Sequence, residues 1–239
     1  MLRDNLPSGC SSFSFARQAL GKDAYEAARL LVDGTDDARR GLAAAVLSAA
    51  SHSVPLMFCA DDAATPFGVA IQPGDKLALV GYMAPVARQF EGKVAETVIF
   101  DKGRELAGHA DVTPCALQAE VLRTCDIVVS SGTSVVNHTV EDLLAMCPNA
   151  REFVLTGTST PMFPTAYKGT PVTSFAGTVW RQDAKDEIFR TIALGGGMMA
   201  CLPLAPERLR ARVGVNGVGD EPTGLVVELL NRLGLVCEQ

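Results

Sequence analysis

The feature that most constrains the fold is a series of short apolar runs that alternate with helical stretches from residue 74 onward. The first run, Leu77–Val80, follows Pro73-Gly74-Asp75-Lys76 and has four apolar residues with no polar residue between them. A strand buried on both faces has this pattern, because helices then cover both sides of the sheet. The sequence therefore predicts an α/β domain built on a mainly parallel sheet.

The later apolar runs extend this prediction along the chain. Strands are expected at 77–80, 97–100, 126–130, 152–156 and 171–175, with a further short one at 178–180. Helices are expected between them at 84–90, 115–124, 139–146, 162–168 and 183–193. The alternation is typical of a Rossmann-like, doubly wound domain, which we assign to residues 71–239.

Residues 1–70 have a different character and are predicted to form a helical cover. An imperfect helical period between residues 13 and 32, interrupted near Gly21, indicates two short helices, and Thr35-Asp36-Asp37 caps another that runs through Ala49. Residues 54–69 have the composition of a linker. Near the other end we expect a basic helical turn with Arg208, Arg210 and Arg212, and an amphipathic helix at 222–233 that docks on the sheet or on a second subunit. A homodimer is therefore left open.

Charge and composition exclude several classes of partner. The net charge is −6 and there is no basic run, which argues against nucleic acid or an anionic membrane. We find no apolar stretch long enough to span a bilayer and no secretory apolar core at the N-terminus, so a cytoplasmic protein is expected. The seven cysteines are scattered singly, without a Cys-x-x-Cys or His-x-x-x-His pair, so no metal cofactor is expected.

The first candidate for function is a glycine turn after one strand and an acid after the next. Gly81 ends the first predicted strand and leads into Tyr82, Met83 and Pro85, and Asp101 ends the second strand about twenty residues on. Folds that bind dinucleotides place an acid at this spacing to accept hydrogen bonds from ribose hydroxyls. The alternative is that Asp101 is an ordinary turn residue.

Two loops rich in serine, threonine and glycine follow the third and fourth predicted strands. Their members are Ser130, Ser131, Gly132, Thr133 and Ser134, with Asn137 beyond them, and Thr156, Gly157, Thr158, Ser159 and Thr160. Small hydroxyl residues with glycine let backbone N–H groups approach an oxygen-rich ligand. Neither loop contains lysine or arginine, which favours a ligand with ribose and carboxylate groups over a triphosphate. Capping and turn formation are the alternative explanation.

Four ordered segments resemble the heavy-metal-chelation family. They are Leu79–Tyr82, Ser131–Leu144, Thr156–Pro161 and Phe175–Gly177. The resemblance implies a Rossmann-like domain joined to an enolase-N-terminal-like domain, with the site between them. This chain has only a mostly helical segment in that second position, so we expect a helical lid there, with Phe13, Phe15 and Tyr25 as lid residues that together with Thr160 face the substrate.

A second similarity, to the S-adenosylmethionine-consuming azetidine-2-carboxylate cyclases of nonribosomal peptide pathways, rests on size, the helical cover and the ligand chemistry. Together these features lead to the hypothesis of an enzyme that binds S-adenosylmethionine or an adenosyl relative at the strand tips. The rivals are a metal- or metallophore-linked binding protein and a nicotinamide oxidoreductase, the latter weakened by the missing second and third glycines.

The residues of this hypothesis fall into two groups. Those expected to hold the reacting amino-acid end are Asn137, Ser131 and Thr133. Those expected to bind the adenosyl compound are Gly81, Tyr82, Met83, Pro85, Asp101, Ser130, Gly132, Thr156, Gly157, Thr158 and Ser159. None of the three histidines, His52, His109 and His138, stands out as a strong base, and His109 lies in a segment, 102–113, that is expected to be a polar, solvent-exposed loop. Positioning of an already activated substrate is therefore the expected source of catalysis.

Overall fold

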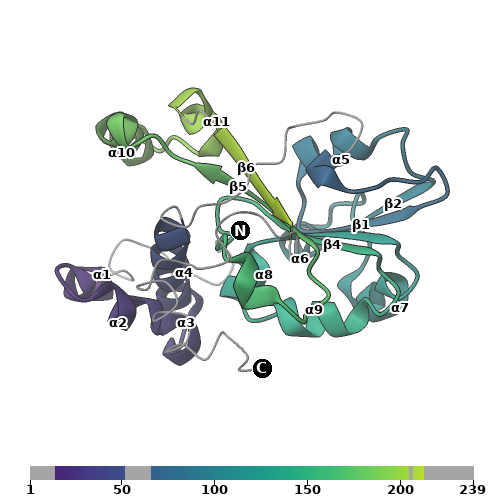
Figure 1. Ribbon diagram of the computed structural model, residues 1–239, viewed down its shortest axis with the longest axis horizontal. Helices are drawn as coiled ribbons and strands as arrows, with labels where there is room; N and C mark the ends of the chain where they lie inside the picture. Colours follow the sequence, from purple (N-terminus) through teal and green to yellow (C-terminus); the bar gives the residue numbers. More distant parts are fainter. Residues whose placement is uncertain (1–13, 52–65, 205–206, 213–239) are drawn as a thin grey trace.

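The computed structural model describes residues 14–51, 66–204 and 207–212, and its centre is one six-stranded sheet (Figure 1). The strands are β1 (Lys76–Val80), β2 (Glu96–Phe100), β3 (Ile127–Ser131), β4 (Glu152–Thr156), β5 (Ser174–Val179) and β6 (Glu207–Arg212). Their order is β2-β1-β3-β4-β5-β6. The first five run parallel and β6 pairs antiparallel with β5, which confirms the predicted α/β fold with a mainly parallel sheet.

Both faces of the sheet are buried, which explains the unbroken apolar runs. Leu77 and Leu79 point to one face, where they meet Phe90 of α5 (Ala84–Phe90). Ala78 points to the other face, into a core shared with Leu122 of α7 (Gln118–Leu122) and with α9 (Val140–Met146). Figure 1 shows α5 on one side of the sheet and α7, α8 (Thr133–Val136) and α9 on the other.

The predicted strand at 171–175 was placed too early in the chain. The strand β5 begins at Ser174 and continues to Val179, so it takes in most of the separate strand predicted at 178–180. Gly177 does not break it, because the missing side chain leaves room for Met162, whose sulfur would lie 3.0 Å from a Cβ at this position. Pro171 cannot donate a ladder hydrogen bond, which fits its place before the strand.

Three other predictions differ from the structure. The helix expected at 162–168 is only a 3₁₀ turn, Pro164–Tyr167, because Pro164 disfavours the helical conformation of the residue before it and so a helix that begins at 162. The basic helical turn expected around Arg210 is the strand β6, consistent with the period-two alternation of its sequence. Residues 102–113, expected to be a polar loop, contain the helix α6 (Lys102–Leu106).

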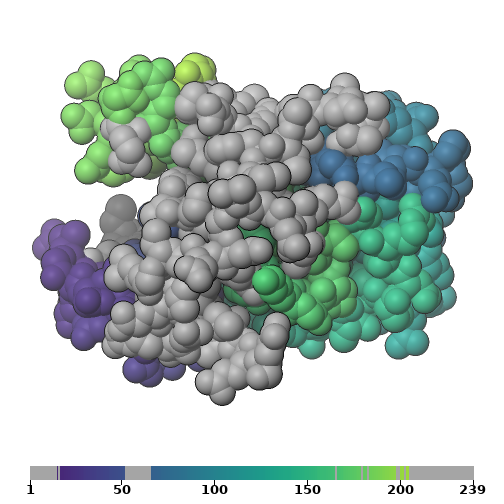
Figure 2. Space-filling model, viewed as in Figure 1, coloured from purple at the N-terminus to yellow at the C-terminus, as the bar shows by residue number. Residues whose placement is uncertain are grey.

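The predicted helical region in front of the sheet is observed for residues 14–51. Its helices are α1 (Ser14–Ala19), α2 (Ala24–Ala28), α3 (Leu30–Asp33) and α4 (Asp37–Ser51). Leu31 and Leu47 pack with Val136 of α8 and Phe163 in one buried cluster, which attaches these helices to the sheet domain. In Figures 1 and 2 they form one lobe, apart from α10 (Lys185–Ala193) and α11 (Met198–Cys201).

Two further helical segments lie close to their predicted positions. The predicted helix 115–124 is a 3₁₀ turn, Cys115–Leu117, followed by α7, and α10 begins after a 3₁₀ turn at Gln182–Ala184. A short 3₁₀ turn at Pro66–Gly68 places Phe67 in the core, and Leu202–Leu204 forms another. The helix predicted at 222–233 lies outside the described residues. Among the described helices, none has the length and apolar character needed to cross a membrane.

An ion pair between Asp75 and Arg151 links the residues that precede β1 and β4, at the amino ends of these strands. The Asp75 side chain is 3% exposed, and its carboxylate receives hydrogen bonds from Nη1 and Nη2 of Arg151 and from the backbone N–H of Gln72. Burial alone would raise the pKa of Asp75, but the hydrogen bonds and charge of Arg151 outweigh it and hold the pKa below its ordinary 3.8.

We predict that Asp75→Asn lowers the free energy of unfolding by about 2 kcal/mol, less than for a fully buried pair because Arg151 is 39% exposed. Since the folded pKa is the lower one, the difference between wild type and variant is complete near pH 7 and is lost as the pH falls through the folded pKa of Asp75. Urea unfolding at several pH values measures it. Asp183→Asn, in the exposed pair with Arg181, is the control and should change nothing measurable. Equal effects of the two substitutions would contradict the prediction.

Candidate functional site

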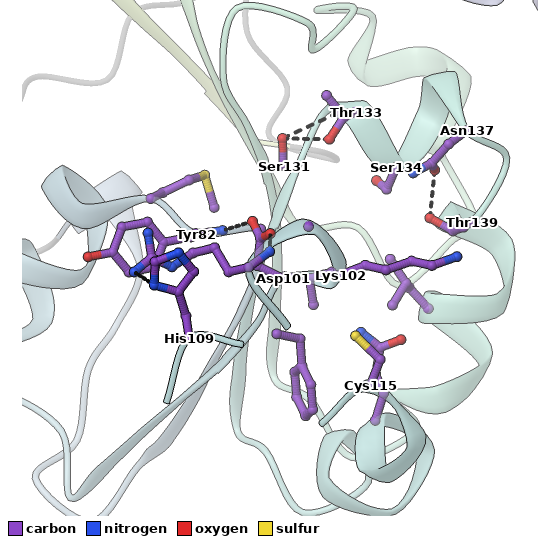
Figure 3. Close-up of a pocket in the computed structure, with 18 of the residues that line it drawn as sticks. Tyr82, Asp101, Lys102, His109, Cys115, Ser131, Thr133, Ser134, Asn137 and Thr139 are labelled. Atoms are coloured by element: carbon purple, nitrogen blue, oxygen red, sulfur yellow. Dashed lines mark hydrogen bonds between the residues drawn. The ribbon is translucent and has the colours of Figure 1, made fainter. Parts of the chain in front are cut away.

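A pocket of about 660 Å³ opens at the carboxyl ends of β1, β2 and β3 (Figure 3). In the sheet, β2 lies on one side of β1 and β3 on the other, so the chain crosses back over β1 between β2 and β3. The pocket lies at this point, where the strand order reverses. Parallel α/β sheets bind ligands at this point, because the loops on the two sides diverge there and leave a crevice. The volume is in the range of small-molecule sites.

Gly81 lines the pocket at the tip of β1. Its φ angle is +100°, and a Cβ built on it would lie 3.0 Å from Cβ of Ser131. The Gly81 N–H donates to the carbonyl of Phe100 at 2.7 Å. A residue with a side chain would be strained by the backbone angle and crowded by the neighbouring strand, so the turn requires glycine.

Both carboxylate oxygens of Asp101 are engaged by backbone groups. Oδ2 accepts from the N–H of Tyr82 at 2.8 Å, and Oδ1 accepts from the N–H of Arg104 at 2.9 Å as the N-cap of α6. The turn and capping role is therefore observed. A carboxylate has further lone pairs, so a ribose contact by Asp101 stays a prediction.

The loop after β3 supplies a wall of neutral polar groups. Ser131 Oγ accepts from the hydroxyl of Thr133 at 2.9 Å, while the fully buried Ser130 donates to Oγ of Ser134 at 3.2 Å. The Asn137 amide, oriented with its nitrogen toward α8, donates to the carbonyls of Thr133 (3.1 Å) and Ser134 (3.0 Å). These bonds hold the hydroxyls and the amide at fixed positions along one side of the pocket (Figure 3).

The loop after β4 lies against the β3 loop and does not line the pocket. Gly132 donates its N–H to the carbonyl of Thr156 at 2.8 Å. A Cβ on Gly132 would lie 2.4 Å from Oγ1 of Thr160, so the two loops are in close contact. The Thr160 hydroxyl is buried and has no hydrogen-bond partner in the described part of the chain. The loop after β4, which its sequence suggested as a second ligand loop, thus packs against the loop after β3 and supports it.

The structure brings together seven of the eighteen residues chosen from the sequence. Those that line the pocket are Gly81, Tyr82, Met83, Asp101, Ser131, Thr133 and Asn137. Those that do not are Pro85, Ser130, Gly132, Thr156, Gly157, Thr158, Ser159, Thr160, Phe15 and Tyr25. Phe13 lies outside the described residues.

The expected lid residues lie elsewhere in the structure. Phe15 borders a separate small cavity of about 230 Å³ at α1 and α2, where Arg39 lies over its ring at 4.9 Å. Tyr25 is in α2, and no residue between 14 and 51 lines the strand-tip pocket. His138 is turned toward these helices as well, with Nε2 2.6 Å from the carbonyl oxygen of Leu31.

The sequence analysis did not assign six polar residues of the pocket to the site. Lys102, Arg104, His109, Cys115, Gln118 and Thr139 also line it. Arg104 lies 3.9 Å over the ring of Tyr82 and donates to both carboxylate oxygens of Asp111, at 2.7 and 3.0 Å. The signal that could have found Lys102 and Arg104 is Asp101 as an N-cap, since it predicts a helix directly after β2.

Cys115 is held as a neutral thiol. Burial raises its pKa to about 11, and the hydrogen bond with Glu105 and the charge of that carboxylate act in the same direction. Because the thiolate is the nucleophilic form, Cys115 is not an activated nucleophile.

The described residues contain no group of three or more histidine, cysteine, aspartate and glutamate side chains placed to hold a metal ion. In the pocket, Asp101 is engaged by two backbone N–H groups, Cys115 is a protonated thiol, and His109 Nδ1 is 3.3 Å from Nη2 of Arg104. A divalent transition metal needs several deprotonated donors around one point. The donor set of this pocket does not fit a resident metal.

The sheet order and the pocket define an α/β protein with a candidate ligand site at the strand tips. A family model, DUF364, described as "Putative heavy-metal chelation", matches residues 63–207, so the chain belongs to the DUF364 family. No curated protein matches the chain.

Two solved structures of DUF364 proteins of unknown function share the fold. The protein from Pyrococcus horikoshii is 20% identical, with a TM-score of 0.64 over 79% of this chain and 74% of that one. The protein from Desulfitobacterium hafniense is 18% identical, with a TM-score of 0.65 over 86% and 79%. These matches bear out the first resemblance and give no support to the second, to azetidine-2-carboxylate cyclases.

We predict that Gly132→Ala destabilises the protein by about 1–3 kcal/mol, because the new methyl group would press on the backbone N and the hydroxyl of Thr160. Thermal or urea unfolding gives the difference. The control is Gly74→Ala, where a Cβ meets nothing within 4 Å. If the two variants are equally stable, the β3 and β4 loops are not in tight contact.

We predict that Cys115 reacts with iodoacetamide at pH 8 roughly 100-fold more slowly than a cysteine in an unstructured peptide, because a pKa of about 11 leaves little thiolate. The rate should rise with pH up to about 11. Peptide mass spectrometry resolves Cys115 from the other cysteines. Reaction at the rate of the free peptide would mean that the thiol is exposed and unperturbed.

Proposed function

We propose that the protein is a small-molecule enzyme that binds S-adenosylmethionine, or a close adenosyl relative, in the strand-tip pocket. The observation that supports this most is the pocket itself, a nucleoside-sized space at the β1/β3 switch point with a wall of serine, threonine and asparagine groups. Neutral donors of this kind suit ribose hydroxyls and an amino-acid end.

The pocket residues divide by their chemistry. The Gly81 turn and Tyr82 face the position proposed for the adenosine, with Asp101 beside them for the ribose. Ser131, Thr133 and Asn137 line the pocket on the β3 side, for the amino-acid end (Figure 3). An aromatic ring such as Tyr82 also stabilises a nearby cation, which a sulfonium is.

The reaction proposed needs orientation more than an activated side chain. A sulfonium is already an electrophile. The substrate's own neutral amine can therefore attack the side-chain carbon bonded to sulfur, forming a carbon–nitrogen bond while the bond from this carbon to sulfur breaks and methylthioadenosine leaves. Closure to azetidine-2-carboxylate is one product of that kind. The protonated state of Cys115 agrees with this, since the pocket offers no thiolate as competing nucleophile.

A metallophore-linked binding role is the second candidate, and the family description favours it. Because the described residues do not supply a set of metal donors, a metal would have to arrive already held by an organic chelator. The same pocket is the candidate site for such a complex.

We predict that Asp101→Asn weakens binding of S-adenosylhomocysteine roughly ten- to hundredfold, because a charge-assisted hydrogen bond to the ribose contributes about 1.5–3 kcal/mol. Titration calorimetry measures the affinity, and circular dichroism verifies the fold, since asparagine can still cap α6. Glu91→Gln, at an exposed residue after α5, is the control.

Two results would count against these assignments. Unchanged affinity in Asp101→Asn removes the ribose role of Asp101. Absence of any adenosyl binding by the wild-type protein, together with recovery of a metal chelate from the purified protein by mass spectrometry, replaces the enzyme proposal with the metallophore role.

A further inference from the structure

Among the described residues that line the pocket, Lys102 and Arg104 carry a positive charge, and of these two only Arg104 has a carboxylate partner in that part of the chain. Arg104 donates to both oxygens of the Asp111 carboxylate and packs on the ring of Tyr82 at 3.9 Å. Its charge is balanced at the pocket edge, and its side chain is only 29% exposed. Arg104 thus stabilises the wall that carries Tyr82.

Lys102 differs from Arg104 in its pairing and in its exposure. Its side chain is exposed, lines the pocket, and makes no ion pair with any residue that the structure describes. Figure 3 shows it stretched across the pocket from the Asp101 side toward Asn137 and Thr139. The position follows from the capping of α6 by Asp101, because Lys102 is the first residue of that helix.

The acids near Lys102 are engaged with other groups. Asp101 receives two backbone N–H groups, and Glu105 accepts from the backbone N–H of Cys115 at 3.0 Å. The hydrogen bonds from Cys115, more than the charge of Lys102, lower the pKa of Glu105. On the wall that Lys102 faces, the lining residues that the structure describes carry no charge and include the hydroxyls of Ser131, Thr133 and Thr139. One cation opposite several neutral donors is the arrangement that suits a single oxyanion group.

We propose that the pocket binds a small molecule bearing one oxyanion group, a carboxylate or a phosphate ester, and that Lys102 is the residue that contacts this group. The inference rests on the proposed function in that it concerns the same pocket, and it adds the charge of the ligand and the residue that selects it. It also revises the expectation from the sequence, which found no cation because it considered only the loops after β3 and β4.

The first experiment tests Lys102 without assuming a nucleoside. Wild-type protein is acylated with a limiting amine-reactive reagent in the presence of inorganic phosphate, of acetate, or of chloride at matched ionic strength, and labelling is measured by peptide mass spectrometry. Lys168, which is exposed and outside the pocket, is the internal control. We expect phosphate or acetate to slow the labelling of Lys102 and to leave that of Lys168 unchanged.

The second experiment compares ligands that differ in the anionic group. S-adenosylhomocysteine is paired with methylthioadenosine, which lacks the carboxylate, and adenosine monophosphate is paired with adenosine. Calorimetry on Lys102→Gln should show a loss of roughly ten- to hundredfold for the anionic member of the preferred pair and little change for the neutral one. Lys102→Arg should retain most of the affinity, and Lys168→Gln all of it. The pair that responds identifies a carboxylate or a phosphate.

Two outcomes separate this inference from the proposed function. If phosphate protects Lys102 but no adenosine compound binds, the adenosyl function is wrong and the anion site stands. If neither anion protects Lys102, and Lys102→Gln binds the anionic and neutral members of each pair as the wild type does, the anion site is wrong even where adenosyl binding is found.

Discussion

The carboxylate of Asp101 connects the two loops on which the pocket depends. One oxygen accepts from Tyr82 after β1, and the other accepts from Arg104 in the first turn of α6. The Gly81 N–H also donates to the carbonyl of Phe100, directly before Asp101. The stacking of Arg104 on Tyr82 adds a further contact between the turn after β1 and α6. The shape of the pocket therefore follows from a short-range capping interaction at the end of β2.

Much of the fold could be predicted because a strand that is buried on both faces of the sheet has consecutive apolar residues in the sequence. The runs at 77–80 and 127–129 are apolar without interruption, since successive residues face two different cores. β5 was harder to place because Gly177 looks like a break, and only the packing of Met162 explains why the strand continues through it. β6 was misassigned because three arginines at alternate positions suggested a charged helix, although a period of two is that of a strand.

The position of the candidate site could be predicted from the sequence, but only some of the residues that line it could be. The strand tips, Gly81 and the serine-rich loop after β3 follow from local rules, and the structure places them together. The loop after β4 has the same composition, yet Thr160 packs against Gly132 and the loop is kept out of the pocket by that contact. Composition alone cannot separate a loop that faces a ligand from one that supports its neighbour. Lys102 was missed for the opposite reason, because it lies in a segment that had been interpreted as solvent-exposed loop.

The N-terminal helices contact the pocket indirectly, through α8. On one side α8 presents Val136 to Leu31 and Leu47, while Thr133 and Ser134 of the same helix line the pocket. A helix of four residues has little stability of its own, so its position depends on the groups packed around it. Arg40 donates from Nε to the carbonyl of Val136 at 3.0 Å, and His138, in a left-handed conformation with φ +58°, reaches the carbonyl of Leu31. Displacement of these helices would therefore move the hydroxyl wall even though they contribute no side chain to the pocket. The N-terminal helices are therefore positioned to affect the site through α8.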